Sequence, residues 1–399
     1  MDYKKRSLYL EKVESFMYKN IIKVLVGQRR VGKSVLLLQI MNKVRNDKPG
    51  SNIVFINKED LAFESISTYN ELVSYAEERK NKETDNFLFI DEIQDIENFE
   101  KALRHFQSKN EWDIYITGSN AKLLSGELAT FLSGRYIEIK VFTLSYTEFL
   151  DFHSLSEDND ALKKYIRFGG LPYLVNLKLN DDIVFEYLKN IYAAILYKDI
   201  IARHSIRNVG FLDKLILFLA DNTGSIVSAK KINDYLKSQN ISISHNVVLD
   251  YLNFLCEAFF VFKAKRNDLK GKKILEFGEK YYFEDLGIRH AIVGYKNDDI
   301  NKILENIVYL HLLINGYDVS VVKLMDKEID FVADKEDNRV YVQVAFSIPD
   351  QRVKEREFGN LLAIRDNFRK VVVSLDEIQV NSYEGVEHMH IRKFLTEQL

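Results

Sequence analysis

The sequence feature that most constrains the fold is a glycine-containing octapeptide that directly follows a short apolar run. Residues 21–26 are rich in isoleucine and valine, and the run is long enough for a buried strand. The octapeptide then reads Gly27, Gln28, Arg29, Arg30, Val31, Gly32, Lys33 and Ser34. Helix-forming residues continue from Val35 to about Arg45. This order of strand, loop and helix is the context in which such an octapeptide binds phosphate.

The chemistry of phosphate binding explains the fixed residues of this loop. Gly27 and Gly32 let the backbone wrap a phosphate with its N–H groups inward, and the helix N-terminus adds the positive end of a dipole. Lys33 would reach the β- and γ-phosphates of a nucleoside triphosphate, and the Ser34 hydroxyl would ligate Mg²⁺. We therefore expect residues 27–35 to bind ATP with Mg²⁺; the alternative is a chance match on a glycine turn.

A second apolar run, residues 87–90, ends in two acidic residues. Asp91 would hold Mg²⁺, directly or through water, and Glu92 would polarise the attacking water as a general base. The alternative is an ordinary strand that ends at an acidic surface turn. Because the run follows a complete phosphate-binding loop at a spacing of about 55 residues, we favour the catalytic interpretation.

A third apolar run, residues 114–117, is followed by Gly118, Ser119 and Asn120. A polar side chain at this point, Asn120 or Thr117, would orient water beside the γ-phosphate. Asn120 has an alternative role as the cap of a helix that we expect to begin near Ala121.

Two further strands complete the expected sheet, one at residues 53–56 and one at 136–141. The strand that precedes the phosphate loop and the strand that ends in Asp91 are the two Walker strands. An extra strand between them, with a glutamate after the aspartate, is typical of the AAA-type class. Residues 27–34, 87–92, 117–120 and 132–136 together resemble the small prokaryotic AAA-family ATPases that carry a C-terminal domain of unknown function. Residues 168–172 resemble that family's junction segment. The resemblance covers nearly the whole chain and implies an α/β fold with a parallel-sheet ATPase core.

Three arginines near the expected site have different expected roles. Arg135 comes just before the fifth strand, where AAA-type proteins often place an arginine finger that stabilises charge on a neighbouring subunit's ATP. This role implies a homo-oligomer, and the alternative is an ordinary surface salt bridge. Arg29 and Arg30 occupy loop positions that do not demand charge, and we expect them to face solvent or brace the loop.

The middle of the chain has the pattern of a winged helix. A helical lid or junction, residues 154–207, follows an ATPase domain that we place at residues 1–153. Three expected helices and a hairpin then occupy residues 208–294. The exposed candidates for contact with duplex DNA are Ser244, His245 and Asn246 on the third helix and Lys270, Lys272 and Lys273 on the wing. The third helix offers no arginine or lysine to read guanine, so docking of a protein partner is the alternative.

Residues 295–399 resemble a PD-(D/E)xK nuclease domain in the order of their expected helices and strands. Glu305 on a helix and Asp330 on a strand match the residues that would hold Mg²⁺. The third element reads Gln343, Val344 and Ala345, with an amide in place of the carboxylate and a methyl group in place of the lysine ammonium. We therefore expect a degenerate module without nuclease activity, in which Glu305 and Asp330 are remnants. Lys354 or Lys323 could instead move into the vacancy.

Composition narrows the setting and leaves three functions open. The 399 residues carry a net charge of -3 and include a single cysteine, which excludes an internal disulfide and a cysteine-based zinc site. Since no apolar stretch approaches the ~20 residues that span a bilayer, we expect a cytoplasmic protein with no membrane contact. The leading hypothesis is an ATPase that couples hydrolysis to remodelling of DNA or a protein partner. The alternatives are a nucleotide-gated switch with little turnover and an ATP-regulated nuclease.

Overall fold

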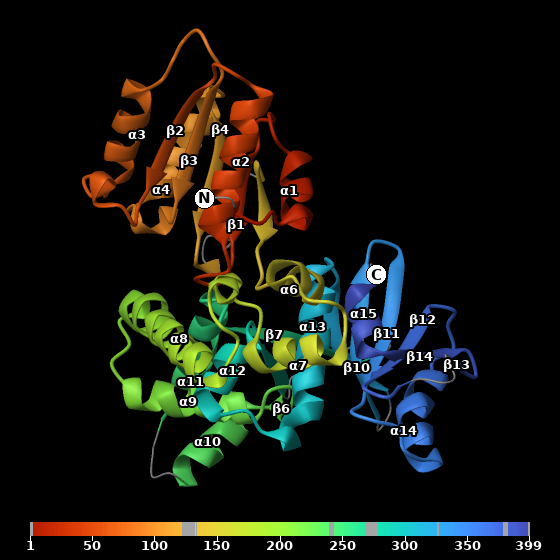
Figure 1. The fold of residues 1–399 in the computed structure, drawn as a ribbon. Helices are drawn as coiled ribbons and strands as arrows, with labels where there is room; N and C mark the ends of the chain where they lie inside the picture. Colours follow the sequence, from red (N-terminus) through yellow and green to blue (C-terminus); the bar gives the residue numbers. More distant parts are fainter. Residues whose placement is uncertain are drawn as a thin grey trace. The chain divides into compact units, whose positions relative to one another are not determined.

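The computed structural model describes residues 3–121, 132, 134–238, 243–268, 278–324, 327–377 and 382–397 (Figure 1). The chain forms two compact units. Unit 1 comprises Met1–Phe142 with Glu257–Phe259, and unit 2 comprises Thr143–Cys256 with Phe260–Leu399. Each unit has its own β-sheet.

Unit 1 is a five-stranded, fully parallel sheet with helices packed against it. Its strands, in sheet order, are β2 (Asn52–Asn57), β3 (Asn86–Asp91), β4 (Asp113–Gly118), β1 (Ile22–Val26) and β5 (Tyr136–Lys140). Its helices are α1 (Ser7–Glu14), α2 (Lys33–Asp47), α3 (Tyr69–Glu78) and α4 (Phe99–Lys109), with 3-10 turns η1 (Leu61–Phe63) and η2 (Ile93–Asp95). All five residues of β1 and all six of β3 are buried, as expected for central strands of a parallel sheet. The predicted α/β class with a parallel P-loop core is confirmed.

The strand between the two Walker strands is not the one that chain order suggested. Residues 53–56 belong to β2, which lies at the edge of the sheet beside β3. The strand that separates β1 from β3 is β4. Because the strands are parallel, the carboxyl ends of β1, β3 and β4 lie at the same end of the sheet. Gly27, Asp91 and Thr117 lie at this end.

The core of unit 1 includes side chains from α1 that the sequence patterns did not single out. Tyr9 and Val13 are buried with Leu36 of α2 and with Phe89 and Tyr115 of the central strands. The last two rings are stacked with centroids 4.7 Å apart. The N-terminal helix is thus part of this unit, and it brings Arg6 toward the phosphate loop.

Unit 2 contains a nine-stranded mixed sheet. Its strands, in sheet order, are β13 (Ser382–Tyr383), β14 (Val386–His390), β12 (Arg369–Ser374), β11 (Asn338–Val344), β10 (Lys327–Lys335), β9 (Asp318–Leu324), β7 (Val261–Asp268), β8 (Glu279–Phe283) and β6 (Ile226–Val227). Its α-helices are α6 (Tyr146–His153), α7 (Asn159–Phe168), α8 (Asp181–Ala194), α9 (Val209–Asp221), α10 (Ala229–Ser238), α11 (His245–Glu257), α12 (Leu286–Val293), α13 (Ile300–Ile314), α14 (Gln351–Leu362) and α15 (Ile391–Thr396). Shorter turns are η4 (Pro172–Asn176), the π-helix η5 (Ile195–Ala202) and η6 (Asn297–Asp299).

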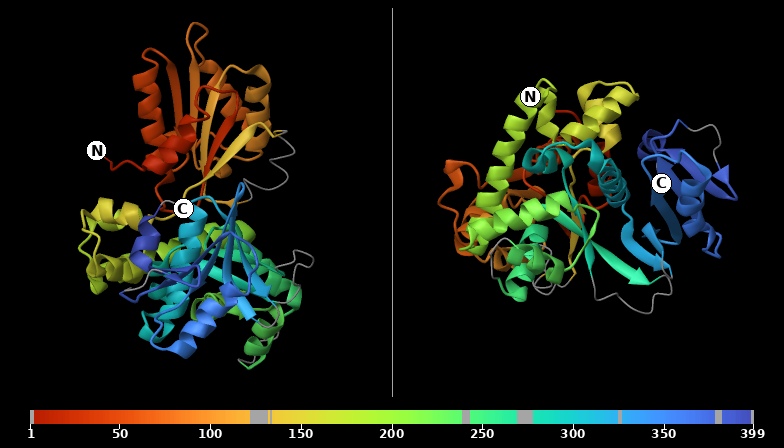
Figure 2. Two further views of the ribbon diagram at one scale, coloured as in Figure 1. Left: turned by 90° about the vertical axis from the view of Figure 1, so that its right-hand side faces the viewer. Right: turned by 90° about the horizontal axis from the view of Figure 1, so that it is seen from below.

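The hairpin β7–β8 is part of the same sheet as the C-terminal strands. β7 pairs with β8 in antiparallel fashion and with β9 in parallel fashion, and Lys265 is opposite Ser320. In the two further views of the ribbon in Figure 2, β8 is teal and the C-terminal strands are blue. Segments that we assigned separately to a winged helix and to a nuclease-like module therefore share one sheet.

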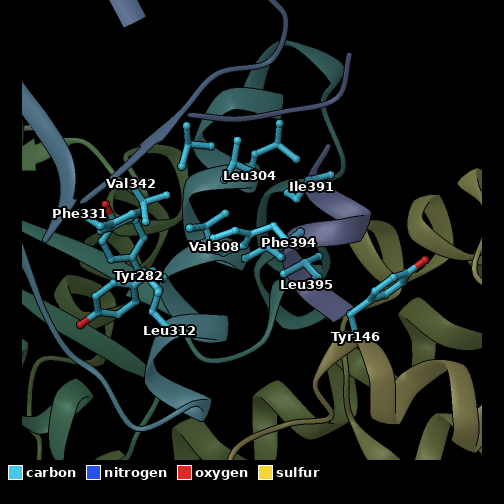
Figure 3. Close-up of a cluster of buried hydrophobic side chains, with 14 of the residues drawn as sticks. Tyr146, Tyr282, Leu304, Val308, Leu312, Phe331, Val342, Ile391, Phe394 and Leu395 are labelled. Carbon is cyan, nitrogen blue, oxygen red and sulfur yellow. The ribbon is translucent and has the colours of Figure 1, made fainter. Parts of the chain in front are cut away.

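The core of unit 2 forms around α13, which packs on this sheet. Leu304, Val308 and Leu312 point from α13 toward Phe331 of β10 and Phe394 of α15 (Figure 3). Because α13 is buried on several faces, Glu305 on this helix is held close to the sheet.

The junction segment around Gly170 is fixed by close backbone packing within unit 2. The Gly170 N–H donates to the Asp285 carboxylate at 2.8 Å, and a Cβ at Gly170 would lie 2.6 Å from the Leu144 carbonyl oxygen. The other Asp285 oxygen accepts from the N–H of Ile288 and caps α12. Among the described residues, no helix is both long enough and apolar enough to cross a bilayer.

Candidate nucleotide-binding site

The loop between β1 and α2 turns so tightly that it requires glycine at position 27. A Cβ on Gly27 would lie 2.1 Å from the carbonyl oxygen of Val141, beyond the end of β5. Gly32 has a φ of 96° and Arg30 a φ of 71°, and α2 begins at Lys33. Left-handed backbone beside a helix N-terminus turns N–H groups toward one concave surface, which is a site suited to a phosphate.

A buried arginine from the N-terminal segment braces this loop. The Arg6 guanidinium donates to the carbonyl oxygens of Val31 at 2.9 Å and Phe142 at 2.8 Å. Its central carbon lies 4.5 Å from the centroid of the Tyr9 ring, and the residue is only 4% exposed. Arg6 therefore links the phosphate loop to the segment that follows β5.

The two loop arginines have different environments. Arg29 is buried and forms an ion pair of 3.0 Å with Glu59, which follows β2. Arg30 is exposed. Of the two roles expected for these residues, Arg29 thus braces the loop and Arg30 faces solvent.

Lys33 lies inside the loop, close to the general-base candidate. Its ammonium donates to the carbonyl oxygens of Gly27 at 3.0 Å and Gln28 at 2.9 Å. The same nitrogen is 3.9 Å from Oε1 of Glu92, and Lys33 is only 4% exposed. The Lys33 ammonium thus lies inside the loop, where a phosphate would bind.

Asp91 ends β3 beside Ser34, so the two expected Mg²⁺ ligands are neighbours. Burial raises the pKa of Asp91 above its ordinary value, although hydrogen bonds from Thr117 and Ser34 oppose this shift. The Thr117 hydroxyl donates to Asp91 and accepts from the N–H of Glu92 at 2.9 Å. A hydroxyl and a carboxylate are oxygen ligands of the type that Mg²⁺ prefers, so these residues fit the ion.

Glu92 is turned away from the strand direction by its backbone, which has a φ of 55°. Its Oε2 accepts hydrogen bonds from Ser119, at 3.1 Å, and from the Gln94 amide. Burial alone would raise the pKa of Glu92, but the Lys33 charge and these hydrogen bonds outweigh burial and lower it. The carboxylate is therefore ionised and is held by donors on two loops.

Asn120 follows the carboxyl end of β4, whereas Arg135 directly precedes β5. Asn120 is buried in the loop after β4, but the residue of that loop whose hydroxyl reaches Glu92 is Ser119. The helix expected to begin near Ala121 lies mostly outside the described residues. The Arg135 side chain is exposed, and its carbonyl oxygen accepts from the N–H of Ile22, at the start of β1. Arg135 thus lies at the amino ends of β1 and β5, whereas the phosphate loop follows the carboxyl end of β1.

Comparisons with known proteins place two parts of the chain in described families. Residues 19–150 match a family model described as an AAA domain, and residues 159–299 match a domain of unknown function (DUF8612). An uncharacterized protein of Haemophilus influenzae is 37% identical over 396 residues, which cover 98% of each chain. The uncharacterized protein MJ1544 of Methanocaldococcus jannaschii is 33% identical over 371 residues, which cover 89% of this chain and 81% of the relative.

A solved structure shows a related fold. The Walker-type ATPase PABY2304 of Pyrococcus abyssi superposes with a TM-score of 0.51 and 17% identity, over 73% of this chain and 96% of that one. The chain belongs to a family of AAA-type P-loop proteins. Membership in this family supports ATP binding by this chain.

The nuclease-like residues of this AAA-type protein also come together, in unit 2. Glu305 of α13, Asp330 of β10 and Gln343 of β11 line one pocket of about 370 Å³. Neither lysine considered for the vacancy joins them, because Lys323 is exposed and the Lys354 ammonium lies 3.9 Å from the centroid of the Tyr383 ring. The lysine that contacts the carboxylates is Lys280 of β8.

The candidate DNA-contacting residues of the AAA-type protein are only partly described. Ser244 accepts from the N–H of Val247 at the start of α11, and His245 and Asn246 are exposed. The wing residues Lys270, Lys272 and Lys273 lie outside the described residues.

Three residues that support the candidate site were not predicted from the sequence. Arg6, Glu59 and Gln94 contact the loop or the general-base candidate. Gln94 follows Glu92 by two residues, and a polar residue there was the available signal. Arg6 and Glu59 carried no such signal, because their contacts depend on the arrangement of α1 and β2.

Proposed function

We propose that this AAA-type protein binds ATP with Mg²⁺ at residues 27–35 and hydrolyses it. One observation carries the proposal: the Glu92 carboxylate is 3.9 Å from the Lys33 ammonium, and Asp91 hydrogen-bonds to Ser34 beside them. A cation, a general-base candidate and a pair of Mg²⁺ ligands thus come together at the end of β1 and β3. This set matches the needs of phosphoryl transfer to water.

Each residue would perform a distinct part of the reaction. The ATP–Mg²⁺ complex supplies the phosphoryl group and the charge of the metal ion. Ser34 and Asp91 would hold the metal ion, and Lys33 would neutralise charge on the β- and γ-phosphates. Glu92 would accept a proton from the attacking water. The Thr117 hydroxyl orients the Asp91 carboxylate and accepts from the backbone N–H of Glu92, while Ser119 donates to the Glu92 carboxylate. Asn120, the next residue of that loop, would position the attacking water.

The test compares two site variants with matched surface controls. We expect Lys33→Ala to lose ATP binding and Glu92→Gln to keep binding but lose hydrolysis by about 10²-fold or more. Lys82→Ala and Glu83→Gln change exposed residues near the other end of β3 and should behave as wild type. Unchanged Mg²⁺-dependent hydrolysis in both site variants would refute the proposal.

We propose that Arg135 acts on the ATP of a neighbouring subunit in a homo-oligomer. Tyr136 is opposite Ile22 and Lys140 is opposite Val26. Arg135 precedes this pairing and Gly27 follows it, so roughly 20 Å of strand separates Arg135 from its own phosphate loop. That separation prevents contact with a nucleotide in its own loop. Light scattering with ATP present would show whether the protein is a monomer. Full ATPase activity of a strict monomer would exclude this role.

A low-turnover switch is the alternative, and the contacts of Glu92 favour it. Ser119, Gln94 and Lys33 all engage this carboxylate, an arrangement that must change before Glu92 can accept a proton. Parallel measurements of ATP affinity and turnover separate the two functions. Tight binding with negligible hydrolysis, even in the presence of duplex DNA, would identify the switch.

We also propose an output for ATP binding in unit 2. Helices α9–α11 and the hairpin β7–β8 follow the chain order of a winged helix, and His245 and Asn246 are exposed at the start of α11. Duplex DNA or a protein partner would dock there. Stimulation of hydrolysis by duplex DNA that is lost in a His245→Ala/Asn246→Ala variant supports DNA, and equal stimulation of both proteins argues for another surface.

A further inference from the structure

Several carboxylates of unit 2 gather where a nuclease of the resembled fold would bind a metal ion. Glu305 of α13, Asp330 of β10 and Glu357 of α14 line the 370 Å³ pocket with Gln343. Glu328 of β10 lies close to Glu305 and Asp330, because all three contact the Lys280 ammonium. Such a concentration of negative charge requires a cation or protons for stability.

A lysine of the hairpin supplies that cation. The Lys280 ammonium lies 2.9 Å from Glu328, 3.2 Å from Glu305 and 3.9 Å from Asp330, and its side chain is only 5% exposed. Three carboxylates thus lie within ion-pair distance of this one buried ammonium.

The carboxylates also have other donors within the protein. These are Tyr282 to Glu305 at 3.2 Å, the Val344 N–H to Asp330 at 2.9 Å, Gln343 to Glu357 at 3.2 Å, Arg266 to Glu328 at 3.1 Å and Arg356 to Glu357 at 2.8 Å. Each of the four carboxylates thus has at least two partners. A polar network with its members satisfied is stable without a further ligand.

The residues at this pocket do not fit a catalytic Mg²⁺ ion. Mg²⁺ demands near-octahedral oxygen ligands at about 2.0–2.1 Å. Gln343 turns its amide nitrogen toward Glu357 and its oxygen toward the N–H of Asp330, at 3.4 Å. The Lys280 ammonium lies among the same carboxylate oxygens and would repel a second cation.

We propose that Lys280 is the resident cation of this cluster, and that it replaces the divalent ion and fastens the hairpin β7–β8 to the C-terminal sheet. Arg266 of β7 adds a second ionic link, to Glu328, next to the parallel pairing of β7 with β9. The cluster is then a structural junction, and the hairpin is an integral part of the sheet that contains β10 and β11.

The first experiment measures Mn²⁺ binding to the full chain without nucleotide, by electron paramagnetic resonance of the free ion. Mn²⁺ is a probe for the Mg²⁺ site of such nucleases. We expect wild type and Asp330→Asn to bind the same number of ions, because any Mn²⁺ bound by the wild type lies elsewhere. Loss of one bound ion in Asp330→Asn would overturn the proposal, as would Mn²⁺-dependent cleavage of duplex DNA that this variant abolishes.

The second experiment compares Lys280→Met with Lys263→Met by thermal unfolding followed by circular dichroism. Lys263 lies on the same hairpin but is exposed and pairs only at the surface, with Glu279. Removing the buried cation takes away the ion pairs of Glu305 and Asp330 and leaves them only neutral donors, so we expect Lys280→Met to lower the midpoint by on the order of 10 °C. Lys280→Arg keeps the charge and should recover part of the loss. Equal midpoints for Lys280→Met and Lys263→Met would overturn the proposal.

Discussion

Replacement of Arg6 by methionine tests whether the N-terminal segment supports the phosphate loop. The variant keeps an unbranched side chain but removes the guanidinium that reaches Val31 and Phe142. Both carbonyl oxygens would lose a charged donor in a buried environment. We expect the loop to be less ordered before ATP binds.

The magnitude follows from these contacts. A hydrogen bond from a charged donor is worth about 1.5–3 kcal/mol, and the contact of Arg6 with the Tyr9 ring adds about 0.5–1 kcal/mol. Methionine recovers part of the packing, so we expect a loss of about 4 kcal/mol in the free energy of unfolding of unit 1. For a unit of this size that corresponds to a fall of about 10 °C in the midpoint.

The only tryptophan of the chain makes unit 1 easy to follow. Trp112 is 5% exposed and packs edge-on against Phe106, so its fluorescence should change when this unit unfolds. Lys5→Met, at an exposed neighbouring position, is the matched control. ATP affinity should also fall, by about tenfold for each 1.4 kcal/mol needed to order the loop. If Arg6→Met and Lys5→Met unfold at the same temperature, the bracing role is refuted.

Three further changes probe the site and the junction. Gly27→Ala should abolish ATP binding because its Cβ would meet the Val141 carbonyl, whereas Gly50→Ala, with open space around it, should bind ATP normally. Gln94→Leu removes a hydrogen bond that lowers the pKa of Glu92, so the acid limb of the pH profile for ATP hydrolysis should move to higher pH; an unmoved limb would exclude Glu92 as the titrating group. Burial raises the pKa of Asp285 to about 6 in the folded protein. The folded state therefore binds more protons than the unfolded state between about pH 4 and 6, and the stability of unit 2 should fall as pH rises through this window in wild type but not in Asp285→Asn, as urea titrations would show.

The ATPase core was predictable because its signals are local in the sequence. The residues around Gly27 specify a strand, a loop and a helix without distant contacts, and Asp91 with Glu92 follows the four apolar residues 87–90 of a strand that is buried throughout. The position of β4 between the Walker strands was less evident. Adjacency in a parallel sheet depends on crossover connections, which chain order does not reveal.

Unit 2 was harder to predict because its main features come from contacts between distant segments. Residues 265–268 of β7 pair with 320–323 of β9 although β8, α12 and α13 lie between them in the chain, and no turn chemistry specifies that pairing. Lys280 lies in an ordinary strand sequence, yet it meets Glu305 and Glu328 in the fold. The sequence identified the vacancy at Ala345 but contained no sign of the side chain that fills its electrostatic role.

The backbone conformation of the adjacent acids Asp91 and Glu92 separates the two chemical roles that we propose for them. Asp91 keeps the strand direction and faces Ser34, and burial raises its pKa. Glu92 adopts a left-handed conformation, which turns its carboxylate toward Lys33 and Ser119, and these donors lower its pKa despite burial. A metal ligand must lose its proton when the ion binds, whereas a general base must first be freed from the donors that hold it. The contacts of Glu92 therefore make the release of this side chain, rather than its ionisation, the step that would control hydrolysis.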